Sequence, residues 1–528
     1  MNRFLAASCA LTIAIAGLGL ATAADRLEVA TLVSPAGGPE GSYGTTVAID
    51  EDRAAVGWSE IDDEGALLGR VTIYVRSPSG GWGDEQTLLS ETPDDLFGSA
   101  IAIEGDRLVV GAPAPCPEAE EGVEITKTRG TVHVFQRSGA VWEQTATLRG
   151  AGACQRFGLA VALGGDRFAA GNRSDHDAVA AVAVYERKGA AWKRAARLRS
   201  PSPDIADDGF GASGLALDGA SLAVGTPPAD PEGQGRGHVH LYTRDAKRWA
   251  ADGILRKPSG SRADLFGTSI DLDAGSMIVG DPHGVGSAHV FELQAGRWRH
   301  RGRLSPDTGG VGDRFGISVG IEGAFAAVGA AAAGSPAEAG VVHAFRERGG
   351  SWKPYRTFAA SGGAAGDMLG TAVGVSDGFV IGGAPSRDTA CGPNAGAAFV
   401  FALTGAGPGA APNVQCGAAA GMSATVDSTV AVSTGAANVP ISGTVTSLFS
   451  GFGPAVLTLR GLTTGTRSST ATAVVTCAEA TATECTWSSV APRTAGRYSV
   501  IVFPRDAYGR HGAPSTPTEV IVVAENNV

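Results

Sequence analysis

The sequence predicts an all-β protein whose larger part is a seven-bladed β-propeller, closed by its own N-terminal strand and followed by a small β-sandwich. Three observations predict this fold. A pair of glycines recurs seven times, each copy carries two further strand patterns, and a stretch rich in Gly, Ala and Pro precedes a last set of alternating runs. We assign residues 1–23 to a signal peptide, 24–404 to the propeller, 405–421 to a linker and 422–528 to the sandwich.

The glycine pair defines the repeat. In each copy an aromatic residue or leucine precedes the first glycine, and the second glycine follows 13 or 14 residues later. Repeats of this length are typical of propellers and solenoids. The first glycines stand 49 to 60 residues apart, at Gly44, Gly98, Gly158, Gly211, Gly267, Gly316 and Gly370.

Each copy predicts four strands, and the second copy is the clearest. Residues 95–103, the turn 104–106 and residues 108–113 read as two strands joined by a tight turn. After a variable loop, residues 130–135 form a third strand, and Trp142 leads into a fourth that ends at Leu148. Five further tryptophans mark the fourth strands of other copies: Trp82, Trp192, Trp249, Trp298 and Trp352.

The seventh copy lacks a fourth strand, because residues 405–412 are glycine, alanine and proline rich. Residues 27–32 match the register of residues 143–148, a fourth strand, and no first three strands precede them. We therefore expect the N-terminal strand to complete the last blade. Closing the ring in this way protects strand edges that would otherwise pair with other chains.

The segments Phe97-Gly98 and Gly111-Ala112-Pro113, with their counterparts in the other copies, resemble the FG-GAP repeat of integrin α-chain propellers and of bacterial secreted relatives. The resemblance covers residues 24–404. It implies a seven-bladed propeller, usually extracellular, that binds proteins or glycans on one face. It also implies that some blades often carry calcium.

The sequence lacks the residue pattern that calcium binding in such blades requires. Sites of this kind resemble EF-hand loops, with oxygen ligands at alternating positions and a glycine, between the first and second strands. Here that turn is too short, as in Asp50-Glu51-Asp52 and Asp273-Ala274-Gly275. We therefore expect no cofactor and no metal site. The segment that comes closest to a calcium-loop pattern is Asp175-His176-Asp177.

The N-terminal residues predict export. Arg3, an apolar run from Leu11 to Leu20, and Ala21-Thr22-Ala23 form the pattern of a cleavable secretory signal. No later run approaches the ~20 apolar residues of a membrane-spanning helix. We expect a secreted, periplasmic or cell-surface protein without a membrane span.

Six cysteines remain after the signal, an even number that suits an oxidising compartment. Fifteen pairings are possible. Strand direction places the loops of Cys116 and Cys154 on the same face, Cys477 and Cys485 fall in one hairpin, and Cys391 with Cys416 remains by subtraction. We predict these three disulfides.

The C-terminal residues alternate between apolar and polar side chains over seven short runs, beginning with Ala424 to Val432 and ending with Thr516 to Val523. Seven short strands favour a β-sandwich. Residues 496–500 and 506–509 loosely resemble the last hairpin of bacterial immunoglobulin-like or fibronectin-like modules. The resemblance implies a spacer or an adhesive stalk.

A ligand site is expected on the propeller face that carries the long connections. There the loops between second and third strands and the blade-to-blade connections vary in length, and rigid scaffolds commonly place function on such loops. Solubilising acidic loops are the alternative. The candidate ligand-binding residues are Glu118, Glu120, Glu121, Glu124, Asp175, Asp177, Asp204, Asp207 and Asp208.

Three other patterns are explained by repetition. Residues 316–320 fit Gly-x-Ser-x-Gly, but Ser318 occupies a repeat position that takes small residues, so no nucleophile is expected. Histidines occupy one third-strand position in four blades, which packing explains: His133, His240, His289 and His343. Aspartates recur three residues before a first glycine, where turn capping is the first interpretation and a carboxylate ring facing a ligand is the second: Asp95, Asp208, Asp264, Asp313 and Asp367.

The composition narrows the function classes. The net charge of −11 and the lack of a basic cluster with interleaved aromatics disfavour nucleic-acid binding. No acid, base or nucleophile converges, so we do not expect an enzyme. The sequence favours an adhesion or binding protein that recognises an extracellular protein or glycan; an extracellular polymer-degrading enzyme and a structural envelope component stay open as alternatives.

Overall fold

The computed structural model describes the propeller and the strands of the C-terminal region. The described residues are 28–34, 41–61, 67–90, 92, 95–114, 129–152, 155–173, 180–200, 209–228, 236–245, 248–258, 264–306, 309–333, 339–389, 393–404 and eight strands between residues 423 and 523.

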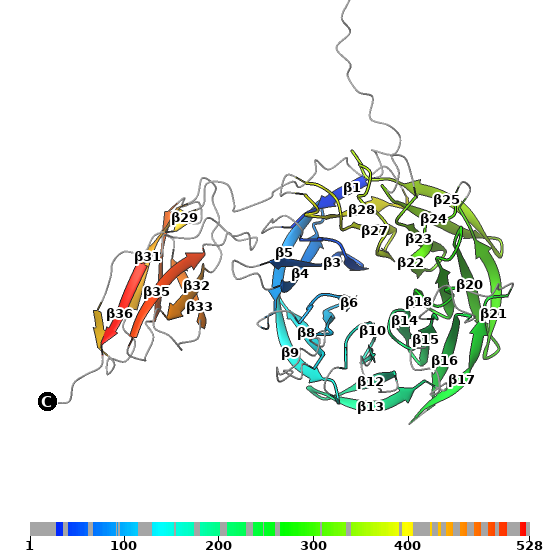
Figure 1. Cartoon of the computed structure of the whole chain (residues 1–528), viewed down its shortest axis with the longest axis horizontal. Helices are drawn as coiled ribbons and strands as arrows, with labels where there is room; N and C mark the ends of the chain where they lie inside the picture. The colour runs from blue at the N-terminus through cyan, green and yellow to red at the C-terminus, as the bar shows by residue number, and fades with distance from the viewer. Residues whose placement is uncertain are drawn as a thin grey trace, which may run out of the picture.

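Seven four-stranded antiparallel sheets form a closed ring, which confirms the seven-bladed propeller (Figure 1). Blade 1 holds β2 (Thr46–Asp50), β3 (Arg53–Ile61), β4 (Leu67–Arg76) and β5 (Trp82–Leu89). Blade 2 holds β6 (Ala100–Glu104), β7 (Arg107–Ala112), β8 (Thr131–Ser138) and β9 (Val141–Arg149). Blade 3 holds β10 (Val161–Gly164), β11 (Arg167–Asn172), β12 (Ala181–Lys188) and β13 (Ala191–Arg199).

The remaining blades follow the same order from the axis outward. Blade 4 holds β14 (Leu215–Asp218), β15 (Ser221–Thr226), β16 (His238–Arg244) and β17 (Trp249–Arg256). Blade 5 holds β18 (Ile270–Asp273), β19 (Ser276–Asp281), β20 (Ser287–Gln294) and β21 (Arg297–Leu304). Blade 6 holds β22 (Phe315–Glu322), β23 (Phe325–Ala330), β24 (Val341–Arg348) and β25 (Ser351–Phe358).

The N-terminal strand closes the ring, as predicted. Blade 7 contains β26 (Val373–Ser376), β27 (Phe379–Ala384) and β28 (Ala397–Ala402), and its outer strand is β1 (Glu28–Leu32). β1 runs antiparallel to β28, with Thr31 opposite Phe399 and Leu32 opposite Ala398 (Figure 1). Val29 and Leu32 are buried in this blade. The first and last parts of the propeller sequence therefore share one sheet.

The glycine pairs hold neighbouring blades together. Every first glycine has a positive φ, between 67° and 99°, which favours glycine. A Cβ atom on Gly111 would lie 2.0 Å from the carbonyl oxygen of Gly158 in the next blade, and the other second glycines meet the next first glycine at 1.8–2.4 Å. Gly383 of blade 7 meets Gly44 of blade 1 in the same way. The paired glycines therefore let the backbones of neighbouring blades touch, because neither residue has a side chain at the contact.

Turn capping explains the recurring aspartates. Oδ1 of Asp95 accepts a hydrogen bond from the Phe97 backbone N–H at 2.9 Å. Asp313 and Asp367 likewise accept backbone N–H groups of their own turns, at 2.6 and 2.9 Å. Asp264 instead accepts the N–H of Gly237, which directly precedes β16, at 2.9 Å.

The C-terminal strands join in the order β29-β31-β34-β33-β32-β35-β36-β30. Six of them match the predicted runs, and the first predicted run appears as two short strands. Their bounds are β29 (Ser423–Ala424), β30 (Ala431–Ser433), β31 (Pro440–Thr446), β32 (Ala455–Gly461), β33 (Ser469–Thr476), β34 (Glu484–Val490), β35 (Gly496–Phe503) and β36 (Thr518–Val523). The immunoglobulin-like identity of this region and the domain limits stay predictions.

Candidate ligand-binding site

The two faces of the propeller differ in their connections. The short turns between first and second strands and between third and fourth strands lie on one face, which we call the turn face. The connections between second and third strands and between blades lie on the other face, which we call the loop face. This division follows from the antiparallel order of every blade.

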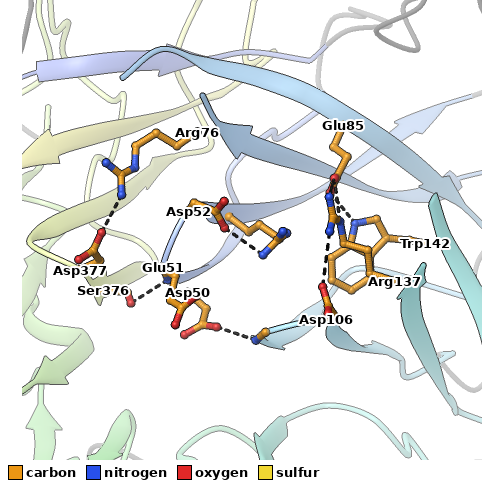
Figure 2. A network of polar contacts seen from close by, with 12 residues as sticks. Asp50, Glu51, Asp52, Arg76, Glu85, Asp106, Arg137, Trp142, Ser376 and Asp377 are labelled. Atoms are coloured by element: carbon orange, nitrogen blue, oxygen red, sulfur yellow. Dashed lines mark hydrogen bonds and ion pairs between the residues drawn. The ribbon is translucent and has the colours of Figure 1, made fainter. Parts of the chain in front are cut away.

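Side chains of one blade hold the turns of the next on the turn face. Oδ2 of Asp50 accepts the Gly105 N–H at 2.6 Å, and Oε2 of Glu104 accepts the Gly165 N–H at 2.6 Å. Ser376 Oγ accepts the Glu51 N–H at 3.0 Å, which joins blade 7 to blade 1 (Figure 2). Several inner turns of this face therefore hold neighbouring blades together.

Ion pairs extend these contacts toward the rim. Arg137 of blade 2 donates to Oε1 of Glu85 in blade 1, at 2.6 Å from Nη2 and 2.8 Å from Nε, while Oε2 accepts the indole N–H of Trp142 at 2.7 Å (Figure 2). The Glu85 side chain is only 4% exposed. Arg76 of blade 1 pairs with Asp377 of blade 7 at 2.6 Å. Each contact joins two blades rather than closing within one.

All nine predicted ligand-binding carboxylates lie outside the described residues. Their loops are nevertheless located by the residues at their ends. Residues 115–128 connect β7 to β8 in blade 2, residues 174–179 connect β11 to β12 in blade 3, and residues 201–208 connect β13 to blade 4. The topology therefore attaches all three loops to the loop face of adjoining blades.

A hollow opens between blades 2 and 3, close to where these loops attach. It has a volume of about 20 Å³, enough for one or two water-sized groups. Three arginines, two amide side chains and two aromatic rings form part of its lining: Arg149, Arg194, Arg197, Gln155, Asn172, Phe157 and Tyr185.

A hydrogen-bond network fixes the inner wall of the hollow. Nδ2 of Asn172 donates to Oε1 of Gln155 at 3.1 Å, and the same oxygen accepts the Gly152 N–H at 3.2 Å. Oδ1 of Asn172 accepts the Ala181 N–H at 2.8 Å. Both amide side chains are buried. The wall is thus held in place without a ligand.

Ala183 accounts for the existence of this hollow. It occupies in blade 3 the position of the four repeated histidines, each of which packs against the phenylalanine of its own glycine pair, with ring centroids 5.2–5.8 Å apart. This contact confirms the packing interpretation of the histidines. Blade 3 keeps the phenylalanine, Phe157, but places a methyl group where the imidazole would lie. Ala183 was not predicted from the sequence as part of a site, although aligning the third strands exposes it.

The repeated histidines also bond to the fourth strand. His133 Nδ1 lies 2.9 Å from Gln144 Oε1, and His343 Nδ1 lies 3.0 Å from Thr357 Oγ1. The blade 3 residues equivalent to these two partners are Arg194 and Arg197. They stand opposite Tyr185 and Ala183 in the β12–β13 ladder, so in blade 3 the fourth strand places two guanidinium donors where the imidazole is absent.

Burial lowers the pKa of two of the repeated histidines so far that they are uncharged near pH 7. Burial, followed by the neighbouring His300, lowers the pKa of His289 to about 3. Burial, followed by His238, lowers the pKa of His240 to about 4. Within the part of the chain that the structure describes, no group of three or more His, Cys, Asp or Glu side chains could hold a metal ion.

Ser318 makes a structural contact. Its Oγ donates to the Gly370 carbonyl oxygen of the next blade at 2.7 Å, and Thr46 and Ser269 make the same bond at 2.6 and 2.9 Å. The hydroxyl thus supports the interblade glycine contact. The predicted disulfides cannot be placed, because the six cysteines lie outside the described residues except for the backbone of Cys485 in β34.

A second hollow, of about 260 Å³, lies between blades 5 and 6 on the turn face. Its lining includes Glu292, Arg301, Glu347 and Trp352. Arg301 pairs within its own blade, with Nε 3.0 Å from Glu292 Oε2. The equivalent residue in blade 1 is Glu85, which instead reaches across to the next blade. The interface between blades 5 and 6 is therefore less filled than that between blades 1 and 2.

Comparison with family models matches residues 298–345 and 352–401 to the FG-GAP repeat. This chain carries FG-GAP repeats. The matched segments run from β21 to β28 and thus cover blade 6 and most of blade 7. The comparison confirms the family resemblance for these residues, and the seven-bladed ring extends the same architecture through the other blades.

Similar solved structures include Sqt1 of Chaetomium thermophilum, at 14% identity and a TM-score of 0.41, covering 68% of this chain and 83% of that one. A putative 6-phosphogluconolactonase of Bacteroides fragilis matches at 10% identity and a TM-score of 0.39, covering 60% of this chain and 85% of that one. A puromycin-hydrolyzing peptidase of Mycobacterium tuberculosis matches at 10% identity and a TM-score of 0.42; the match covers 79% of this chain and 61% of the peptidase. A search of curated proteins found no match.

FG-GAP repeats are typical of extracellular proteins. Among the described residues, no helix has the length and apolarity needed to cross a bilayer.

Proposed function

We propose that this protein is an exported binding or adhesion protein that recognises an extracellular protein or glycan through the loop face of blades 2 to 4. The observation that carries the proposal is the contrast between the two faces. Interblade bonds occupy the turn face, whereas the loop face carries long connections on three adjoining blades and a hollow beside them. A rigid ring that displays variable loops suits recognition.

Closure of the ring supports this role, because a binding surface gains affinity when little of it must be ordered on binding. β1 seals the last blade, and glycine contacts join each blade to the next. The propeller therefore presents its loop attachments in fixed positions.

The proposed setting is outside the cytoplasm. The FG-GAP repeats, the signal-like residues 1–23 and the even cysteine count of the remaining chain support it. We propose that the protein is not an enzyme and that binding requires neither calcium nor another cofactor, since the inner turns lack the spacing of calcium loops.

The test is a binding screen of residues 24–528 against arrayed extracellular glycans and proteins, with and without EDTA. Three charge-neutralised variants probe the loops: E118Q/E120Q, D175N/D177N and D204N/D207N. The matched control is E51Q/E143Q, which removes two exposed carboxylates away from the loop face.

A saturable ligand whose affinity is changed by at least one loop variant, and not by the control, supports the proposal. A ligand whose affinity falls only in the control contradicts it, as does turnover of a polymer substrate. Loss of binding in EDTA would overturn the statement that no calcium is required.

A further inference from the structure

We propose that the hollow between blades 2 and 3 binds the carboxylate or sulfate group of an acidic polysaccharide. This inference rests on the proposed function and names the ligand class of the loop face. Arginine forms strong, geometrically specific hydrogen bonds to such anions.

Three arginines line the hollow without a carboxylate partner among the described residues. Arg194 and Arg197 extend from β13, and Arg149 comes from the end of β9 in the neighbouring blade. No carboxylate among the described residues forms an ion pair with any of the three. All three residues are exposed, and their positive charges around one hollow favour an anion placed there.

Blades 2 and 6 hold an imidazole at the place that is open in blade 3. There the fourth-strand side chains at these positions bond to the histidine ring. In blade 3 both side chains are arginines, and Ala183 leaves the imidazole's place open. An oxyanion entering from solvent can occupy that place and accept from both guanidinium groups.

The size and surroundings of the hollow limit which ligands it can accept. The hollow has room for the oxygen atoms of a head group but not for a sugar ring, so the ring must remain outside, on the loop face. The Tyr185 ring is stacked on Phe168 with centroids 4.8 Å apart and is buried. It is therefore unavailable for stacking on a nucleobase, which disfavours nucleic acid as the occupant.

The test uses the chain 24–528 with three immobilised polymers: polygalacturonate, heparin and neutral dextran. The two acidic polymers distinguish a carboxylate from a sulfate ligand. The first variant, A183H, restores the side chain found in four other blades and so should fold while filling the hollow. The second, R194Q/R197Q, removes the two donors.

The matched control is R297Q/R299Q, which removes the same charge from exposed positions on the outer strand of blade 5. We expect binding to at least one acidic polymer and none to dextran. Both A183H and R194Q/R197Q should weaken that binding about tenfold or more, while the control changes it less than about twofold.

Three results would overturn the inference: no binding to either acidic polymer, equal losses in the control, or unchanged binding in A183H. Equal affinity for a single-stranded DNA 20-mer would also overturn it, because the surface would then be a general polyanion binder. A different ligand that depends on the loop carboxylates but not on Ala183 would overturn this inference and leave the proposed function intact.

Discussion

Asp271 departs from the repeat at the scale of a single residue. It lies on the inner strand β18, where the other six blades carry alanine or glycine: Ala48, Ala102, Ala162, Ala216, Gly320 and Gly374. Its carboxylate accepts the Ile321 N–H of blade 6 at 2.8 Å and the Leu272 N–H at 2.9 Å. Burial, with a smaller contribution from the nearby Asp273 and Asp218, raises the pKa of Asp271 to about 7 against the two hydrogen bonds, which lower it.

The Asp271 carboxyl should therefore make stability depend on pH. Its pKa is higher in the folded protein than its ordinary value of 3.8, so its contribution is greatest below about pH 4 and is lost as the pH rises toward about 7. We expect D271A to be more stable relative to the parent at pH 8 than at pH 4. Melting temperatures of both proteins at the two pH values check this.

Taking the difference between parent and variant cancels the opposite contribution of His240 and His289, whose lowered pKa values favour stability at higher pH. If the difference in melting temperature between the parent and D271A is the same at both pH values, the pKa of Asp271 is not raised in the folded protein.

Glu85 joins two blades through three hydrogen bonds from Arg137 and Trp142. The substitution E85Q removes the charge and leaves the guanidinium with a weaker acceptor. We expect it to lower the free energy of unfolding by about 1.5–3 kcal/mol. Urea titration checks this, with E143Q as an exposed control on the neighbouring blade; an effect no larger than that of E143Q would mean that the contact is not formed in solution.

At the scale of elements, the backbone contact between paired glycines sets the spacing of the inner strands. G111A places a methyl group 2.0 Å from the Gly158 carbonyl oxygen. We expect it to lower the free energy of unfolding by about 3 kcal/mol, because the blades must separate to relieve the clash. G83A is the control, since a Cβ there meets nothing within 4 Å. Equal melting temperatures for the two variants would contradict the tight contact.

β1 is the second element that decides the stability of the ring. Val29 and Leu32 are buried, and burial of such side chains contributes about 1.5–3 kcal/mol each. Removing residues up to 34 also exposes the edge of β28. We expect the truncated chain to aggregate or to melt at a lower temperature than residues 24–528, as light scattering and calorimetry would show. A monomer of unchanged stability would mean that β1 is not needed to close the ring.

The sequence predicted these elements well because each blade repeats the same constraints. Each blade needs a glycine with positive φ, a second glycine with no room for a Cβ atom, and an aspartate that caps a turn. The same residue types therefore recur at regular intervals along the sequence. β1 was predictable because it keeps the fourth-strand pattern. The side-chain contacts between blades could not be predicted in this way. Glu85 and Arg137, for example, are 52 residues apart, and only the folded ring brings them together.

The candidate site was harder to predict. The notable feature of blade 3 is a missing side chain, Ala183, and an alanine carries no signal until the blades are aligned. The acidic loops were predicted to bind a ligand from their composition alone, and they lie outside the described residues.

For the whole molecule, the proposed function rests on the division into two faces. The turn face uses its polar side chains for cohesion between blades (Figure 2). The loop face leaves three arginines and long connections for a ligand. Ligands should therefore bind one face of the ring and leave the other exposed to solvent.

Hydrogen exchange of residues 24–528, with and without the ligand found in the screen, tests this claim most directly. We predict that the ligand slows exchange at residues 149–157, 172–173 and 180–185, beside the loop attachments, and leaves the turns at residues 50–53, 104–107 and 273–276 unchanged. Protection confined to those turns would show that the ligand binds the opposite face and would contradict the account.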